Sequence, residues 1–257
     1  MSALLGGALA DGTLSKESAA ALLAVPNLAT RVAEGLGEES VAPEVMLVSA
    51  LADDSFSIAK QAPQVARGQN RLLDALATAQ RSADVLVQTR LLNGAALGPY
   101  RTLATAPRME VGLNYDAKFH KTPLFDQVLI TLAGALAKAR AAGPSQSVRT
   151  FTLLITDGDD TVSSSTADQV AALVSDMALP CNHIVAGMGI GEADDFQEVF
   201  GRIGIAPEWI LTSTESSQDI ASKFASLANS LRLAASSEQA FRRLVAGPAP
   251  GTRTATA

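Results

Sequence analysis

The sequence is poor in aromatic residues, cysteine and histidine. Aromatics make up 4% of the 257 residues, and Cys181 is the single cysteine. One cysteine excludes an intramolecular disulfide and a cysteine-based zinc cluster, and it fits a reducing compartment. Neither of the two histidines, His120 and His183, has a second histidine at ligand spacing. A zinc site built on histidine is therefore not expected.

The chain also lacks long apolar runs and an excess of positive charge. No apolar stretch reaches the roughly 18 residues that span a bilayer. The first residues have no basic segment ahead of their short apolar stretch, so neither membrane insertion nor a secretory signal is expected. The formal net charge is -6 and the 20 Lys and Arg are scattered, which argues against a nucleic-acid partner. We therefore expect a cytoplasmic protein.

Three parts are predicted along the chain. Residues 1–42 are rich in alanine and predict a helical extension, which Pro26 interrupts and Gly35 and Gly37 end. We interpret this extension as a lid over one edge or face of a sheet, with a docking element as the alternative. Residues 43–235 form the main domain. Residues 236–257 predict a short helix around Phe241 and a tail rich in Pro, Gly and Thr.

Strands and helices alternate in the main domain, which predicts βαβ units and an α/β fold. Hydrophobic residues make up 47% of the chain, a composition that suits helices packed on a parallel sheet. Strands are expected at 44–51, 85–94, 151–156, 182–189 and 208–213, an edge segment near 100–105, and helices at 70–80, 124–136, 166–177, 196–203 and 217–234.

Oxygen-bearing side chains follow the predicted strands. The run "LLITDGDDTV" places Asp157 at the carboxyl end of a buried strand, where ligands bind in open α/β sheets. Asp53, Ser55 and Ser57 follow the first strand, and Thr122 precedes Pro123 at the start of a helix. The first loop alone is equally consistent with a solvated turn whose side chains cap the next helix. Oxygen-bearing side chains in three loops at the same edge of the sheet favour a metal site.

The ordered set resembles the metal-ion-dependent adhesion site (MIDAS) of the von Willebrand factor A (vWA) domain family. That pattern is Asp-x-Ser-x-Ser on the first loop, Thr on the second and Asp on the third; here Phe56 stands between the serines, where the family usually has glycine. The resemblance covers about residues 43–235. It implies a vWA-like, Rossmann-like fold: a doubly wound, mainly parallel central sheet with one antiparallel edge strand, flanked by helices.

The resemblance also implies a function. A divalent cation, Mg²⁺ with Mn²⁺ or Ca²⁺ as alternatives, is expected to bind at Asp53, Ser55, Ser57, Thr122 and Asp157. Hydroxyl ligands leave the charge of the ion largely uncancelled, so it can attract an Asp or Glu of a partner protein. The chain is then a non-enzymatic module for protein-protein interaction, expected in a multi-protein assembly or an ATPase complex.

Two other functions stay open. Asp157, Asp159, Thr161 and Val162 match the nucleophile motif of haloacid dehalogenase-like phosphatases, in which Asp159 is the acid. The later strand end "IVAGMGIG" lacks the expected hydroxyl, however, and Lys223 and the acidic run "EADD" come in the wrong order. In the metal-site interpretation Asp159 and Asp160 are solvated loop residues. The other alternative is a metal-free scaffold.

Overall fold

The described residues fold around one six-stranded sheet. The computed structural model describes residues 2–79, 84–94, 96–142, 145–178, 183–191 and 193–246, so Cys181 lies outside them. The strands are β1 (Glu44–Ala52), β2 (Asp84–Leu91), β3 (Arg101–Thr102), β4 (Ser147–Thr156), β5 (His183–Ile190) and β6 (Ile210–Ser213). Their order is β3-β2-β1-β4-β5-β6, and each pair is parallel except β2 with β3. This confirms the predicted sheet and its antiparallel edge.

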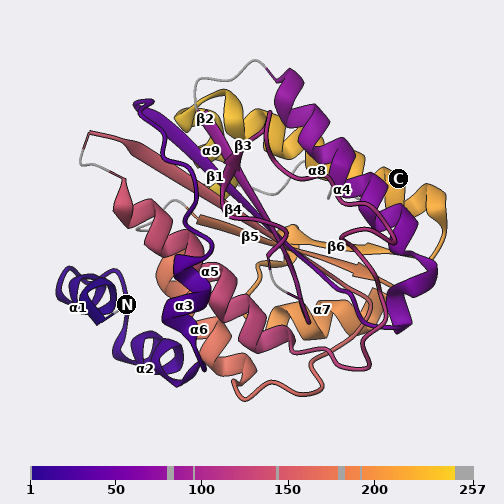
Figure 1. The fold of residues 1–257 in the computed structure, drawn as a ribbon, viewed down its shortest axis with the longest axis horizontal. Coiled ribbons are helices and arrows are strands. Elements are labelled where there is room, and N and C mark those ends of the chain that lie inside the picture. Colours follow the sequence, from indigo (N-terminus) through magenta and orange to yellow (C-terminus); the bar gives the residue numbers. More distant parts are fainter. Residues whose placement is uncertain are drawn as a thin grey trace.

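Helices cover both faces of the sheet. Those of the main domain are α4 (Ala62–Thr78), α5 (Leu124–Ala141), α6 (Ala167–Ala178), α7 (Ala193–Arg202), α8 (Ser217–Ser236) and α9 (Glu238–Ala246), with short 3-10 turns η1 (Ser57–Lys60) and η2 (Pro207–Trp209). In Figure 1, α4, α8 and α9 lie over one face, and α5, α6 and α7 lie over the other. Among the described residues, no helix has the length and apolar character needed to cross a membrane.

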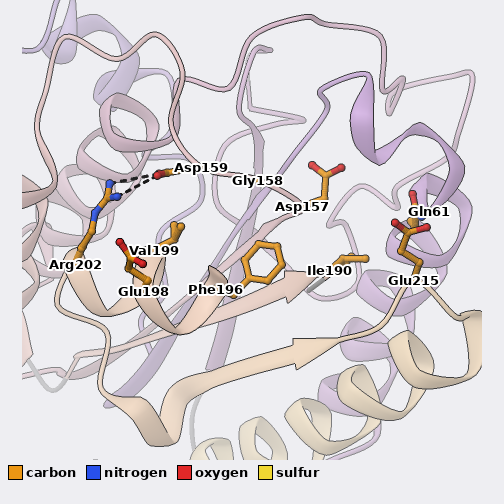
Figure 2. Close-up of a pocket in the computed structure, with 11 residues that line it drawn as sticks. Gln61, Asp157, Gly158, Asp159, Ile190, Phe196, Glu198, Val199, Arg202 and Glu215 are labelled. Atoms are coloured by element: carbon orange, nitrogen blue, oxygen red, sulfur yellow. Dashed lines mark hydrogen bonds and ion pairs between the residues drawn. The ribbon is translucent and has the colours of Figure 1, made fainter. Parts of the chain in front are cut away.

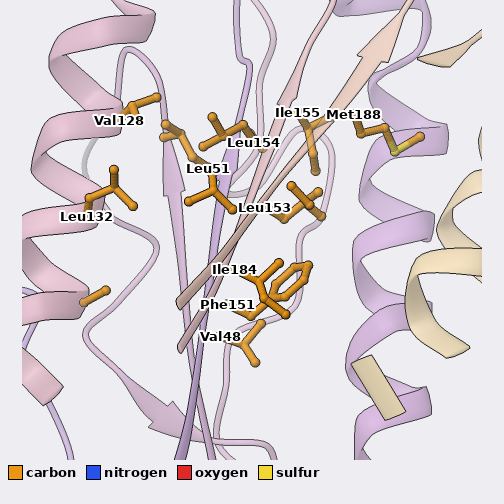
Figure 3. Packing of buried hydrophobic residues seen from close by; sticks show 14 of the residues in the cluster. Val48, Leu51, Val128, Leu132, Phe151, Leu153, Leu154, Ile155, Ile184 and Met188 are labelled. Carbon is orange, nitrogen blue, oxygen red and sulfur yellow. The ribbon is translucent and has the colours of Figure 1, made fainter. Parts of the chain in front are cut away.

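Side chains of the central strands alternate between the two helical layers. Figure 3 shows Leu51 and Leu154 on the side of the sheet that faces α5. Phe151, Leu153 and Ile155 point to the other side. Because both faces are covered, β1 and β4 are buried over nearly their whole length, and β1 is apolar except for Glu44 and Ser49.

The register of β1 against β4 sets where the two strands end. Glu44 pairs with Ser147 and Ala52 with Ile155, so the two strands stay paired up to their carboxyl ends. The chain leaves β1 toward β2 on one side, and β4 flanks β1 on the other. The two loops that follow β1 and β4 therefore meet at the point where the strand order reverses, the usual ligand site of such sheets.

The N-terminal residues form α1 (Ser2–Ala10), α2 (Lys16–Ala24) and α3 (Leu28–Ala33), as the composition predicts. They pack on α5 and α6 rather than directly on the sheet. Ser15 donates to Asp176 of α6 from both its N–H and its hydroxyl, each at 2.7 Å. Only the segment after α3 reaches the sheet edge, where the N–H of Glu38 donates to the carbonyl of Tyr100 at 2.8 Å. The expected lid thus covers mainly helices.

Several predicted element spans differ from the structure: β4 begins at Ser147 instead of 151, α5 extends to Ala141 instead of 136, and β2 ends at Leu91 instead of 94. Helix α4 begins at Ala62 and not near residue 70, because Pro63 fits a first helical turn and Val65 continues the buried face. Strand β6 begins at Ile210, since Pro207–Trp209 forms the 3-10 turn that precedes it.

Gly68 of α4 tests the packing of α4 on α8. A Cβ at Gly68 would lie 2.0 Å from the ring of Phe224 in α8, whereas a Cβ at Gly134 of α5 has no atom within 4 Å. Glycine to alanine in a helix ordinarily gains up to about 1 kcal/mol. We expect Gly134→Ala to show that gain and Gly68→Ala to lose about 1–3 kcal/mol through overpacking. Urea unfolding measures both changes, and a stabilised Gly68→Ala protein would contradict this packing.

Candidate functional site

Asp53 anchors the loop that follows β1. Its N–H donates to the carbonyl of Ile155 in β4 at 2.9 Å. Its Oδ1 accepts the N–H of Ser55 at 2.7 Å, and its Oδ2 accepts the hydroxyl of Thr156 at 2.6 Å. The residue is fully buried. Since donors of the chain fix both oxygens, the carboxylate has one orientation and it sets the path of the loop.

Serine hydroxyls connect this loop to Asp157. The Oγ atoms of Ser55 and Ser57 lie 2.9 Å apart, within hydrogen-bond distance. The Ser57 hydroxyl donates to Oδ1 of Asp157, also at 2.9 Å. Together with the bond from the Ser55 N–H to Asp53, these contacts join four of the five predicted site residues in one hydrogen-bonded set.

The carboxylates of this set repel one another. Burial, and next the charge of Asp53, raise the pKa of Asp157 to about 6, although its hydrogen bond from Ser57 acts in the opposite direction. Burial is also the main reason that the pKa of neighbouring Asp54 is raised. Burial disfavours the charged form of both carboxyl groups, and the charge of Asp53 adds to this effect at Asp157. A cation beside Asp157 would offset both effects.

Thr122 reaches the same rim through the third loop. Its N–H donates to Oγ1 of Thr161 at 2.9 Å, and its carbonyl accepts the N–H of Thr161 at 3.0 Å. Thr161 lies four residues after Asp157. The hydroxyl of Thr122 takes no part in the hydrogen-bonded set formed by the described residues. The backbone of Thr122 is thus hydrogen-bonded to the loop that carries Asp157. Its hydroxyl is not hydrogen-bonded to the other four site residues.

Sequence reasoning missed three residues that support the first loop. Oδ1 of Asp54 accepts the N–H and the side-chain amide of Asn93, at 2.8 and 3.0 Å. The hydroxyl of Tyr115 donates to the carbonyl of Asp53 at 2.7 Å. Oδ2 of Asp54 is buried without a hydrogen-bond partner. The doubled acid after β1 was a visible signal for Asp54, but nothing in the sequence connects Tyr115 to a residue 62 positions earlier.

The helix-capping alternative for the first loop is wrong. Helix η1 begins at Ser57 and α4 at Ala62, and neither has a side-chain hydrogen bond at its N-cap. Asp53 and Ser55 are buried rather than solvated. The polar side chains of the loop bond to each other and to β4 and Asp157 instead.

Asp159 and Asp160 are not simply solvated, in contrast to the sequence interpretation. Asp159 forms an ion pair with Arg202 of α7, with contacts of 3.1 and 3.5 Å. Asp160 accepts the N–H of Phe125 at the start of α5 and both donors of Ser163. Asp160 is thus structural, and Asp159 is held by Arg202 and not poised as a free acid beside Asp157.

The two histidines stay outside the site chemistry. His183 is buried, and its Nδ1 is hydrogen-bonded to the Thr150 hydroxyl. Burial lowers its pKa to about 3. His120 is exposed, and its ring lies 5.4 Å from the ring of Phe56.

The donor set fits a hard cation. Among the described residues no cluster of three or more His, Cys, Asp or Glu side chains is arranged to hold a metal ion. Any metal here must therefore use hydroxyls and water in addition to Asp53 and Asp157. Mg²⁺ and Mn²⁺ accept such oxygen ligands and retain several waters.

Comparisons with known proteins support the fold. No protein-family model matches the chain, and no curated protein sequence matches it. Among solved structures, the chain is similar to the pilus adhesin SpaC from Lactobacillus rhamnosus GG, in the open conformation, with 14% identity and a TM-score of 0.52. That alignment covers 77% of this chain and 31% of SpaC.

Two further structures are similar at lower scores. Proximal thread matrix protein 1 from the mussel byssus, solved with a zinc-occupied MIDAS motif, has 13% identity and a TM-score of 0.48, over 75% of this chain and 47% of that one. The ArnB paralog VWA2 from Sulfolobus acidocaldarius has 15% identity and a TM-score of 0.42, over 75% and 46%. The chain thus spans less than half the length of each of the three proteins.

These comparisons identify the fold. The function has to be inferred from the residues of the site. The match to SpaC and the strand order together show that the chain has the vWA-type fold. At such low identity a shared fold says nothing of shared partners.

The burial of Asp157, together with repulsion from Asp53, predicts an unusual pH dependence in metal-free protein. Because the folded pKa of Asp157 is raised from 3.8 to about 6, the stability linked to its proton is fully present below about pH 4 and lost as the pH rises through 6. At pH 7.5 in EDTA, Asp157→Asn should exceed wild type by about 1 kcal/mol, after allowance for solvent screening.

Urea unfolding at pH 4 and pH 7.5 measures this difference. The advantage of Asp157→Asn should disappear at pH 4, where wild-type Asp157 is already protonated in the folded state. Asp168→Asn, an equal change of charge at an exposed position of α6, is the matched control. Equal stability of wild type and Asp157→Asn at pH 7.5 would show that the two carboxylates do not repel.

Proposed function

We propose that this chain is a metal-dependent protein-interaction module. Mg²⁺, held by Asp53, Ser55, Ser57, Thr122 and Asp157, would bind a carboxylate of a partner protein. The observation that carries the proposal is the hydrogen-bonded set that runs from Asp53 through the two serines to Asp157. It gathers oxygen ligands around the buried carboxylate of Asp53 and the half-buried carboxylate of Asp157, which a cation would stabilise.

The metal, when bound, supplies a positive charge for an acidic ligand. The residues of the chain position it: Thr156 and the Ser55 N–H hold both oxygens of Asp53, and Ser57 holds Asp157. Where neutral hydroxyls and water, rather than the two carboxylates, contact the ion directly, most of its charge stays uncancelled. A partner carboxylate could then replace one of the waters on the ion.

The surroundings of the site suit a protein partner. Each of the three loops exposes an apolar side chain: Phe56 is 61% exposed, Phe119 38% and Val162 48%. Neighbouring apolar side chains at a polar site are typical of surfaces that dock another protein. Phe119 is tied to the first loop, since its carbonyl accepts the N–H of Phe56 at 2.6 Å.

Binding is a better account of the site than phosphotransfer. A phosphatase of the haloacid dehalogenase type needs Asp159 as an acid, but its carboxylate is paired with Arg202. A metal-free scaffold leaves the gathering of Asp53 and Asp157 unexplained. For the wider context we propose a cytoplasmic multi-protein assembly, with an ATPase complex as one form of it; this rests on the family resemblance.

A thermal-shift titration tests the metal site. Mg²⁺ at about 100 times its Kd should stabilise the protein by about 2.7 kcal/mol, or about 5–10 °C in Tm for a chain of this size. Mn²⁺ and Ca²⁺ are titrated in parallel. Asp53→Ala should abolish the rise and Asp159→Ala should retain it. The opposite pattern would favour phosphotransfer, and no metal effect in wild type would favour the scaffold.

Carboxylate binding is tested with a small probe. N-acetyl-glutamate amide is titrated into ¹⁵N-labelled protein with Mg²⁺, and N-acetyl-glutamine amide is the uncharged control. The glutamate probe should shift the amide signals of Ser55 and Ser57 and bind at least about tenfold more tightly than the control. Ser55→Ala and Thr122→Ala should each weaken it to the level of the control. Equal binding of the two probes would mean that the metal does not capture carboxylates.

A further inference from the structure

Arg90 of β2 carries a buried positive charge for which the described residues supply no partner. The residue is 3% exposed. Within the described part of the chain it forms no ion pair and donates no side-chain hydrogen bond, and its Nε is enclosed without an acceptor. Its two terminal nitrogens also lack a partner there but are not enclosed in this way. A ligand can therefore reach the end of the guanidinium group.

Two other arginines show how the chain compensates such a charge elsewhere. Arg149 of β4 is fully buried, and it donates to Oε2 of Glu44 at 3.1 Å. Arg202 of α7 is paired with Asp159, as Figure 2 shows. A buried charge is strongly destabilising unless an opposite charge or hydrogen bonds compensate it. Arg90 lacks this compensation among the described residues, and an anion would supply it.

The Arg90 side chain lies in the layer between the sheet and the helices α3 and α5. Arg90 pairs with Leu51 of β1, which faces α5 in Figure 3, and residues paired across parallel strands point to the same face of a sheet. Two residues earlier on this face, the side-chain amide of Gln88 donates to the carbonyl of Gly35, just after α3, at 3.1 Å. The N-terminal extension therefore covers this part of β2.

A second arginine of this layer lies close to Arg90. Arg31 of α3 is half-buried, and it donates to Oε1 of Gln127 in α5 at 3.0 Å. This acceptor is a neutral amide and does not cancel the charge. Burial, and next the charge of Arg31, lower the pKa of Arg90 to about 10, while the charge of Glu34 acts in the opposite direction. Glu34 is exposed and forms no ion pair within the described chain.

We propose that Arg90 and Arg31 bind a small oxyanion of the phosphate type between the N-terminal extension and the sheet. Guanidinium groups present N–H donors in a fork that matches the oxygens of phosphate. Two of them carry the charge that a phosphate dianion balances, whereas a single carboxylate would leave one positive charge uncompensated. The site is independent of the proposed metal site. Because Arg31 belongs to α3 and Arg90 to β2, the anion would also join the extension to the sheet.

A phosphate titration in metal-free buffer tests the site. The arginine Nε–H signals of the full ¹⁵N-labelled chain are followed at constant ionic strength, with chloride as the reference anion. Phosphate should shift the signals of Arg90 and Arg31 and bind with a Kd of about 1 mM or lower, and acetate should bind at least about tenfold more weakly. No shift of either signal, or equal binding of acetate, overturns the proposal.

Methyl phosphate, titrated in parallel, identifies the source of the phosphate group. Binding as tight as that of inorganic phosphate supports a phosphomonoester as the ligand. Binding of inorganic phosphate alone supports the free ion. Both outcomes support an oxyanion site, and they differ only in the room that the site leaves around the fourth oxygen.

Matched variants separate this site from a general salt effect. Arg90→Met removes the buried charge at similar volume and should weaken phosphate binding at least about tenfold. Arg71→Met makes the same change of charge at an exposed position of α4, and it should leave binding intact. Arg31→Met, at a half-buried position, should weaken binding at least about threefold and provides the test if Arg90→Met does not fold. Equal binding by wild type and the Arg90 or Arg31 variant overturns the proposal, as does equal loss in Arg71→Met.

Urea unfolding distinguishes a bound anion from compensation within the chain. In chloride buffer Arg90→Met should have a higher urea midpoint than wild type, because it removes a buried charge without a partner. Phosphate should raise the midpoint of wild type more than that of Arg90→Met. Glu34→Gln should bind phosphate about twofold more tightly, since it removes a negative charge near both arginines. A lower midpoint of Arg90→Met in chloride, together with an equal effect of phosphate on both proteins, would show that Arg90 is compensated by the chain and overturns the proposal.

Discussion

The parallel pairing of β1 with β4 is the constraint on which the site depends. The strands are in register from Glu44 and Ser147 to Ala52 and Ile155, and the N–H of Asp53 extends the ladder by one more bond to β4. Two buried strands therefore end side by side, each followed by an aspartate. The position is the point where strand order reverses, which is the usual ligand site in sheets of this kind. The fold thus brings the two negative charges together.

Charge repulsion at this position needs compensation. Asp53 receives it from the Thr156 hydroxyl and the Ser55 N–H, so its carboxylate is satisfied within the protein. Asp157 accepts hydrogen bonds from the Ser57 hydroxyl and from its own backbone N–H. Its pKa is nevertheless raised to about 6, first by burial and next by the charge of Asp53. These donors therefore do not fully compensate the Asp157 carboxylate, and a cation bound there would stabilise its charged form.

The sequence predicted the strands and the rim residues better than their contacts. Strand periodicity and "LLIT" before Asp157 were sufficient for the sheet, because buried parallel strands have a composition of their own. The ordered motifs found Asp53, Ser55, Ser57 and Asp157. Tyr115, the engaged state of Asp159 and the packing of the N-terminal helices on α5 and α6 could not be found, because each depends on contacts between distant segments. Nor could the sequence show that Thr122 bonds to the third loop through its backbone N–H and carbonyl.

The rim of the sheet is chemically asymmetric, and this bears on how a partner must approach. The loops after β1 and β4 and the loop before α5 expose Phe56, Val162 and Phe119, while the ends of β5 and β6 with α7 enclose an acidic cavity. Asp157 lies on the boundary between the two. A carboxylate alone could approach a cation from many directions. A partner that also packs apolar side chains on Phe56, Val162 and Phe119 is restricted in its orientation, so specificity arises from what surrounds the metal rather than from the metal itself.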